Sequence, residues 1–164
     1  MALQSKMTVY VAIAGVLALM GGIVFYASLD NAQLEQAEIE LFSVELRGVD
    51  NLKNEAKFDV TFLIKNPSEK AFTVGIIDYQ LFTNGIELGS GQYSAMDVAL
   101  PGRAVFSSGD QIPLKSTFVL IKSEINPEIY EDMINGKINN FTAEGVLTTQ
   151  TSWSTIDKEF STGF

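Results

Sequence analysis

The chain has 164 residues, a formal net charge of −9 at pH 7, and neither cysteine nor histidine. The absence of these two residue types excludes zinc sites, thiol redox chemistry, and Cys-His or Ser-His-Asp catalysis. All 20 acidic residues and all but one of the 11 basic residues follow residue 29. Such an acidic surface argues against binding nucleic acid, which needs a basic footprint.

Residues 7–29 form an uncharged apolar run. As a helix that rises about 1.5 Å per residue, the run is long enough to cross the roughly 30 Å hydrocarbon core of a bilayer. Tyr10 and Tyr26 lie near its two ends, where amphipathic rings favour the headgroup level. We therefore predict a single-pass transmembrane anchor. A cleaved signal peptide and a pilin-like stalk are the alternatives, but small residues do not precede a suitable cleavage point, and the run has no early acidic residue.

Charges on either side of the run predict its orientation. Positive residues stay in the cytoplasm. Lys6 precedes the run, and four carboxylates follow it closely: Asp30, Glu35, Glu38 and Glu40. We expect residues 1–6 to be cytoplasmic and the C-terminal domain to lie outside the cell membrane.

The anchor carries small residues on one face. Ala14, Ala18 and Gly22 recur every four residues, and Gly21 widens the face that they form. Small faces of this kind let a second helix approach closely. Because small residues are also common in helices that only tether a domain, contact with a partner subunit and simple tethering both remain open.

After the anchor, residues 30–37 are predicted to form a stalk or an extension of the helix, and residues 38–164 a single domain. Phe58, Val60, Phe62 and Ile64 alternate with more polar residues, which indicates a half-buried strand. A weaker alternation of the segment containing Phe42, Val44 and Leu46 predicts a strand before it.

Residues 72–83 read as another strand whose phase switches near Ile76-Ile77, as at a bulge. Asn84-Gly85 follows and predicts a hairpin with a type I′ turn, in which both central residues have positive φ. Gly89 and Gly91 favour a bulge on the return strand. Further strands are expected at 96–100, 105–107, 114–122, 141–149 and 153–160.

One short helix interrupts the strands. Asn126 is a suitable N-cap, Pro127 fits the first helical position, and Asn135-Gly136 closes the helix. Short strands separated by turn residues are typical of an antiparallel β-sandwich.

The order of these segments resembles a known family over roughly residues 36–164. The resemblance is carried by Phe58 to Pro67, by Val74 to Leu81, by the hairpin Asn84 to Gly91, by Asn140 to Leu147 and by Ile156 to Gly163. It is similar to the WHy domain (water stress and hypersensitive response), the type-2 late embryogenesis abundant fold. The resemblance implies an immunoglobulin-like or fibronectin-III-like sandwich with one helix, here as a membrane-anchored member, and it implies no catalytic residue.

Asn66-Pro67 is the most specific step of that resemblance. The family's usual Asn-Pro-Asn stands here as Asn66-Pro67-Ser68. Proline ends a strand, and an asparagine side chain can satisfy nearby backbone groups, so we expect a structural corner rather than a ligand site. Asn140-Phe141-Thr142 is a glycosylation sequon, usable if the domain faces outside.

These features favour a non-enzymatic protein that works by contact. We expect no catalytic, metal-binding or cofactor-binding residues and no small-molecule substrate. The expected partners are the lipid bilayer and one or more proteins of a membrane or cell-envelope assembly, in which the chain would be a structural or accessory subunit. The alternative function is protection of the envelope during desiccation or osmotic stress.

Overall fold

The computed structural model describes residues 2–96 and 104–164. The predicted strand at 96–100 lies almost entirely outside these residues. The elements in chain order are α1 (Ala2–Leu34), β1 (Glu38–Asp50), β2 (Glu55–Lys65), β3 (Phe72–Thr83), β4 (Ile86–Ser94), β5 (Val105–Phe106), β6 (Gln111–Ile121), the 3-10 helix η1 (Lys122–Glu124), α2 (Pro127–Ile134), β7 (Phe141–Gln150) and β8 (Thr155–Gly163).

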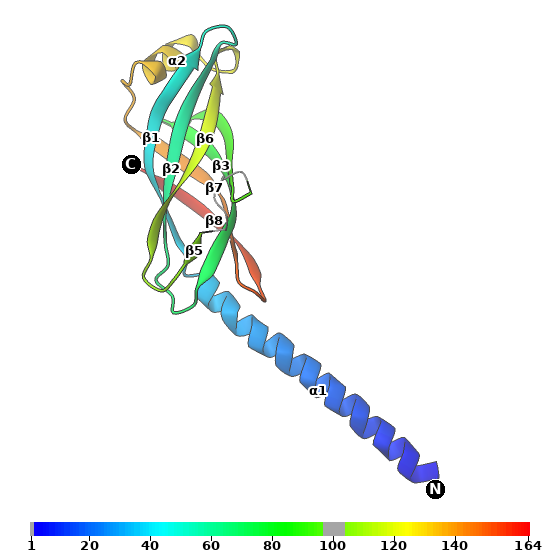
Figure 1. Ribbon diagram of the computed structural model, residues 1–164. Helices are drawn as coiled ribbons and strands as arrows, with labels where there is room; N and C mark the ends of the chain where they lie inside the picture. The colour runs from blue at the N-terminus through cyan, green and yellow to red at the C-terminus, as the bar shows by residue number, and fades with distance from the viewer. Residues whose placement is uncertain (1, 97–103) are drawn as a thin grey trace.

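The strands form two antiparallel sheets. The smaller has the order β1-β2-β6, and the larger has the order β4-β3-β7-β8, with β5 pairing with the start of β3. The sheets cross each other in an elongated domain, and α1 projects from one end as a long isolated helix (Figure 1). α2 lies at the opposite end of the domain. The domain therefore has one end next to α1 and an opposite end, next to α2, which we call the distal end.

The core lies between the two sheets. The predicted alternation of β2 is confirmed, since Phe58, Val60, Phe62 and Ile64 are all buried. Phe62 meets the ring of Tyr79 from the larger sheet edge to face, with ring centroids 4.9 Å apart. Aromatic pairs in this geometry add to the stabilisation that burial alone gives. This contact joins the middle of one sheet to the middle of the other.

Tyr79 lies between two glycines in the larger sheet. It pairs with Gly91 of β4 on one side and with Gly145 of β7 on the other. A Cβ atom on Gly91 would approach the Tyr79 ring to 2.4 Å, and one on Gly145 would approach the Asp78 carbonyl oxygen to 2.0 Å. Both glycines are therefore required by close approach, as glycine in a strand often is.

The phase changes predicted in β3 and β4 are present as bulges. In β3 the register with β7 shifts at Gly75, so that Val74 and Ile77 both face the core. In β4 the register shifts at Leu88. Asn84 and Gly85 have φ values of 49° and 79°, as a type I′ turn requires.

β6 begins at Gln111, three residues before the predicted start at Leu114. Two further predictions failed at exposed rings. The predicted last strand began at Trp153, but β8 begins at Thr155 and Trp153 lies in the preceding turn. In β1, Ile39 and Leu41 face the core, and a register shift at Phe42 leaves that ring 65% exposed. Both errors have the same cause, because apolar residues at turns and bulges imitate the alternation of a buried strand.

The predicted short helix is present as α2. The Asn126 side chain accepts a hydrogen bond from the Glu128 amide (2.8 Å), and Tyr130 and Met133 are buried. The helix ends at Ile134, and Gly136 follows with a φ of 64°. α2 therefore closes the distal end of the core.

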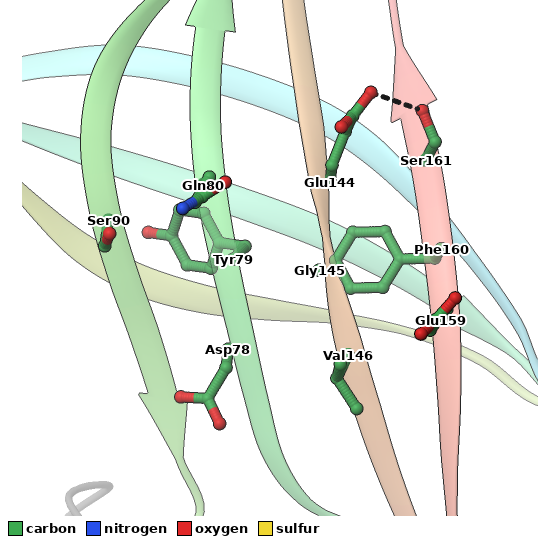
Figure 2. A pocket seen from close by; sticks show the side chains of 10 residues that line it. All are labelled: Asp78, Tyr79, Gln80, Ser90, Glu144, Gly145, Val146, Glu159, Phe160 and Ser161. Carbon is green, nitrogen blue, oxygen red and sulfur yellow. Dashed lines mark hydrogen bonds between the residues drawn. The ribbon is translucent and has the colours of Figure 1, made fainter.

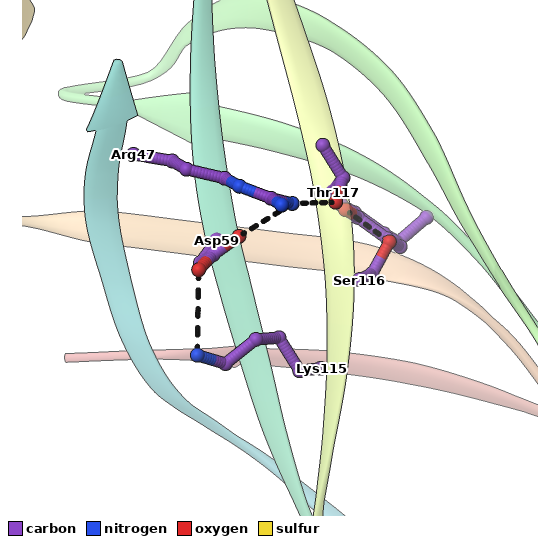
Figure 3. A network of polar contacts seen from close by, with 6 residues as sticks. Arg47, Asp59, Lys115, Ser116 and Thr117 are labelled. Atoms are coloured by element: carbon purple, nitrogen blue, oxygen red, sulfur yellow. Dashed lines mark hydrogen bonds and ion pairs between the residues drawn. The ribbon is translucent and has the colours of Figure 1, made fainter. Parts of the chain in front are cut away.

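The outer face of the smaller sheet is polar across all three strands. Asp59 of β2 lies 3.3 Å from the Lys115 ammonium and 3.8 Å from the Arg47 guanidinium, and Arg47 also donates a hydrogen bond to Thr117 (Figure 3). Exposed ion pairs of this kind contribute about 0–1 kcal/mol each. Their main consequence is that this face suits water rather than another packed layer.

Burial makes Tyr79 sensitive to high pH. Burial raises its pKa from 10.0 to about 12, although a hydrogen bond from its hydroxyl to Ser116 (3.1 Å) acts in the opposite direction. Because the folded state keeps the phenol protonated, this contribution to stability is complete below about pH 10 and is lost as the pH rises towards 12.

We therefore predict that Tyr79→Phe flattens the alkaline loss of stability. Between roughly pH 10 and 12, the wild type should lose about 2 kcal/mol more free energy of unfolding than the variant. Below that range the variant should be less stable by about 1 kcal/mol, since it lacks the Ser116 hydrogen bond. Urea unfolding of the full chain in mild detergent measures both, and parallel pH profiles would contradict the prediction.

Candidate functional site

The candidate site is the junction between α1 and the domain, where polar side chains contact the end of the helix. Lys6–Leu34 is long and apolar enough to cross a membrane, by length and composition, and its apolar window is not buried by the domain. α1 continues without a break to Leu34, which is 1% exposed, and Ala37 after it is fully buried. Of the predicted stalk or helix extension at 30–37, residues 30–34 continue the helix and residues 35–37 follow it as a turn, with Leu34 and Ala37 packed in the core of the domain.

Lys158 of β8 donates hydrogen bonds to two backbone carbonyls that lie just after the end of α1. Its ammonium donates to the carbonyl oxygens of Glu35 and Ala37, each at 2.8 Å. α1 has no basic residue in its own last turn, so a cation from elsewhere in the chain complements the negative end of the helix dipole. Charge-assisted hydrogen bonds are stronger than neutral ones, which makes Lys158 the main polar link between helix and domain.

Two loops hold α1 from different sides just before its end. In the β2–β3 loop, the Glu69 amide donates to Gln33 (3.4 Å), and the Lys70 ammonium lies 5.9 Å from the centre of the Tyr26 ring. In the β7–β8 turn, the Ser154 hydroxyl is hydrogen-bonded to the Asn31 side chain. Contacts from two loops and one strand fix the direction in which the helix leaves the domain.

The predicted Asn66-Pro67 corner lies at this same end. Asn66 is 1% exposed and uses its whole side-chain amide: it donates to the Lys70 and Phe106 carbonyls, both at 2.9 Å, and accepts from the Ser68 amide and hydroxyl. No hydrogen-bonding capacity of this amide is left for a ligand. The geometry therefore favours the structural corner over the ligand site, and it keeps the β2–β3 loop in position against α1.

The described chain leaves most of the predicted small face of α1 uncovered, although Trp153 shares a hollow with Gly22. Ala14, Ala18, Gly21 and Gly22 are exposed, and a Cβ atom on either glycine would meet nothing within 4 Å. Most of the face is free for a contact outside this chain, and the prediction of helix packing stays open.

The other predicted residues lie at the distal end. The Asn84-Gly85 turn and Asn140 line a hollow of about 480 Å³ that also borders α2. The Asn140 side chain is exposed, which leaves its sequon accessible, while its carbonyl accepts a hydrogen bond from Thr83 (2.9 Å). The predicted site residues therefore lie in three separate places. These are the small face of α1, the Asn66-Pro67 corner, and the distal end with Asn84, Gly85 and Asn140.

The largest hollow described is a broad, open depression of about 770 Å³ on the larger sheet. Figure 2 shows Asp78, Glu144 and Glu159 around it, with the Phe160 ring beside Gly145. Asp78 accepts a hydrogen bond from Gln92 (2.5 Å), and Glu144 accepts one from Ser161 (3.2 Å). The surface is acidic and shallow.

The lining of this depression carries acidic side chains without a basic partner. None of its ten lining residues is a lysine, arginine, cysteine or histidine. Within the described residues, no group of three or more acidic, cysteine or histidine side chains is placed to hold a metal ion. The Ser161 hydroxyl beside the Glu144 carboxylate is exposed, and no cationic side chain in the lining accompanies the pair. We read the depression as a solvated acidic face.

The exposed aromatic residues do not form one patch. Tyr93 is buried, Phe82 is half-buried, and Phe164 packs beside Phe141 with ring centroids 5.8 Å apart. Trp153 is 72% exposed and lies beside α1, where it lines a hollow of about 370 Å³ with Leu19, Gly22, Ile23 and Tyr26.

The sequence analysis did not identify Lys158 as a residue of the junction, although its position in the alternation of β8 indicates a structural role. In β8 the half-buried residues include Ile156, Lys158 and Phe160, whereas Asp157 and Glu159 are exposed. A lysine in the inward phase of a strand needs a polar partner inside the fold. That pattern marks Lys158 as a structural cation, but only the structure identifies the helix end as its partner.

Several solved structures align with this chain, one of them with a TM-score above 0.5. A solution structure of an Arabidopsis thaliana protein aligns with a TM-score of 0.51 at 17% identity, over 77% of this chain and 80% of that one. A candidate late embryogenesis abundant (LEA) protein aligns with a TM-score of 0.47 at 16% identity, over 92% and 84% of the two chains. A protein from Archaeoglobus fulgidus aligns with a TM-score of 0.47 at 14% identity, over 76% and 94%. Neither a family model nor a curated protein matches the chain.

These similarities bear on architecture alone. At 17% identity, the alignment with the Arabidopsis protein shows a common fold and does not carry a function from one chain to the other.

We predict that Lys158→Met loosens the junction. The variant keeps the length of the apolar stem but leaves the Glu35 and Ala37 carbonyls without their charged donor, which should cost about 1.5–3 kcal/mol of stability. Thermal unfolding of the full chain in mild detergent measures the loss. Lys115→Met is the matched control, because Lys115 pairs only with Asp59 on the exposed face of the smaller sheet. Equal melting temperatures for the two variants would contradict the assigned role of Lys158.

Proposed function

We propose that this chain is a non-enzymatic, single-pass membrane protein whose domain works by contact. In this proposal residues 7–29 cross the cell membrane, residues 1–6 are cytoplasmic, and residues 38–164 form the extracytoplasmic domain. The domain serves as a structural or accessory subunit of a membrane-protein or cell-envelope assembly.

The observation that carries the proposal is the packed junction between α1 and the domain. A domain on a flexible linker explores many orientations, but here the helix ends inside the domain core at Leu34 and is capped by Lys158. A fixed angle between helix and domain presents the same surfaces at the same height above the membrane. Such presentation reduces the entropy lost when a partner in the same membrane is bound.

The family assignment is part of this proposal. The sequence resemblance to the WHy and type-2 late embryogenesis abundant family runs through the Asn66-Pro67 corner and the Asn84-Gly85 hairpin, and the Arabidopsis structure with a TM-score of 0.51 is compatible with it in fold. We assign the two packed sheets to a sandwich of the immunoglobulin or fibronectin-III type.

A stress-protective role is the second candidate. It is favoured by the sequence resemblance, since the family is named for the response to water stress, and one of the similar solved structures is a candidate LEA protein. A protective protein would act without a stoichiometric partner. Mild detergent extraction followed by mass spectrometry therefore separates the two roles, because only the accessory role gives a stable complex.

We predict that the domain is accessible from outside the cell. Lys6 before the apolar run and the carboxylates after it favour this orientation. Protease added to intact cells that express the chain should degrade the domain. If the domain is instead protected until the cells are lysed, the orientation is reversed.

We also predict that the small face of α1 contacts a partner helix. Ala18→Leu with Gly22→Leu keeps the segment apolar, so membrane insertion should be unchanged, but the larger side chains fill the face. The variant should insert normally and separate from its partner in mild detergent. Ala12→Leu with Val16→Leu is the control, because these residues lie on the opposite face of the helix. Co-purification of both variants at wild-type yield would mean that the helix only tethers the domain.

A further inference from the structure

We propose that the β7–β8 turn, residues 151–155, is a second membrane-contact site that inserts the Trp153 ring into the lipid interface. The inference rests on the proposed membrane span of α1. It names the lipid bilayer as the occupant of the surface beside Trp153, and it gives the domain two attachment points instead of one.

The position of Trp153 along α1 is the first argument. Its side chain shares a hollow with Leu19, Gly22, Ile23 and Tyr26. Leu29, the end of the apolar run, lies about two helical turns beyond Gly22, or roughly 10 Å along the axis. When the run is placed in a bilayer, the ring of Trp153 therefore lies on the membrane side of the end of the span, beside Tyr26. Tryptophan and tyrosine are enriched near the membrane–water interface, where the outer part of this hollow lies.

The composition of the turn is the second argument. The Trp153 side chain is 72% exposed, and residues 151–155 (Thr-Ser-Trp-Ser-Thr) include no charged residue. The β1–β2 turn at the opposite end also exposes an apolar residue, Leu52, at 96%. That turn carries Asp50 and Lys53 beside Leu52 and suits water. Of these two turns, only the one next to α1 combines an exposed apolar ring with no charged residue in the turn itself; Lys70 of the β2–β3 loop lies 5.9 Å from the centre of the neighbouring Tyr26 ring.

Internal hydrogen bonds of the turn make its backbone compatible with an environment that contains little water. Thr151 accepts hydrogen bonds on its hydroxyl from the amides of Trp153 (3.3 Å) and Ser154 (3.1 Å), and its own amide donates to the Ser154 carbonyl (2.8 Å). Peptide groups that enter a bilayer must be paired internally. These three bonds reduce the number of peptide groups that insertion would leave unpaired.

The turn is also held in place before any membrane contact is made. The Ser154 hydroxyl is hydrogen-bonded to the Asn31 side chain of α1. Further along β8, the Lys158 ammonium donates a hydrogen bond to the Glu35 carbonyl, just after the end of the same helix. Figure 1 shows the β7–β8 hairpin projecting beside α1 at the end of the domain where the helix leaves. The ring is thus directed towards the plane that the helix crosses, and its insertion would restrict rotation of the domain about the helix axis.

Trp153 is the only tryptophan of the chain, so its fluorescence tests the proposal without a label. The full chain is reconstituted into phosphatidylcholine vesicles, with or without bromine atoms near the top of the acyl chains. Bromine quenches only rings close to it. We expect a roughly two-fold fall in Trp153 emission in brominated vesicles, since interfacial tryptophan lies at this depth. Aqueous acrylamide should quench it weakly.

The matched control moves the single tryptophan to the distal end. The double variant Trp153→Phe, Leu52→Trp retains the anchor and the number of tryptophans, and Leu52 is almost fully exposed. Its emission should be unaffected by the brominated lipid and strongly quenched by acrylamide.

The outcomes separate this inference from the proposed span. If alkaline carbonate washing removes the protein from the vesicles, the membrane span itself is wrong. If the protein resists washing but Trp153 behaves like the distal control, the span stands and lipid contact by the turn is overturned. If Trp153 is shielded from both quenchers, protein covers the ring, and the proposed lipid occupant is wrong.

Discussion

The end of α1 imposes the constraint on which the rest of this structure depends. A helix that ends against a packed core leaves backbone carbonyls at and just after its last turn that need hydrogen-bond donors. Here Lys158 satisfies the carbonyls of Glu35 and Ala37, and Leu34 and Ala37 pack into the same core that the strands form. The helix and the domain are consequently one folded unit, and β8 is the strand that joins them.

This constraint makes the two ends of the domain different. The end at the junction gathers the saturated Asn66 corner, the Lys70 contact with Tyr26 and the turn that carries Trp153. The distal end is closed by α2, and the exposed Leu52 lies in a charged turn. Between them, the sheets present the acidic depression and the ion pairs around Asp59. The two ends of the domain therefore differ in charge and in exposed apolar surface.

Much of the fold follows from short-range patterns. The alternation of Phe58 to Ile64 marked a strand because side chains alternate between the faces of a sheet, and Asn84-Gly85 marked a turn because these residues tolerate positive φ. Asn126 and Pro127 marked the start of α2 for equally local reasons. The same patterns failed at Phe42 and Trp153, where exposed rings beside a bulge and a turn resembled strand residues.

By itself, the sequence determined the apolar helix, the antiparallel strands with their turns, the short helix and the absence of cysteine and histidine chemistry. Each of these depends on neighbouring residues or on composition. Only the tertiary structure decided that Lys158 would meet the end of α1, 121 residues away from Ala37, and that the Asn66 amide would be fully used within the fold. It also placed Trp153 beside Gly22 and Tyr26. Such contacts join distant segments, and their partners are set by sheet register and packing, which no local pattern encodes.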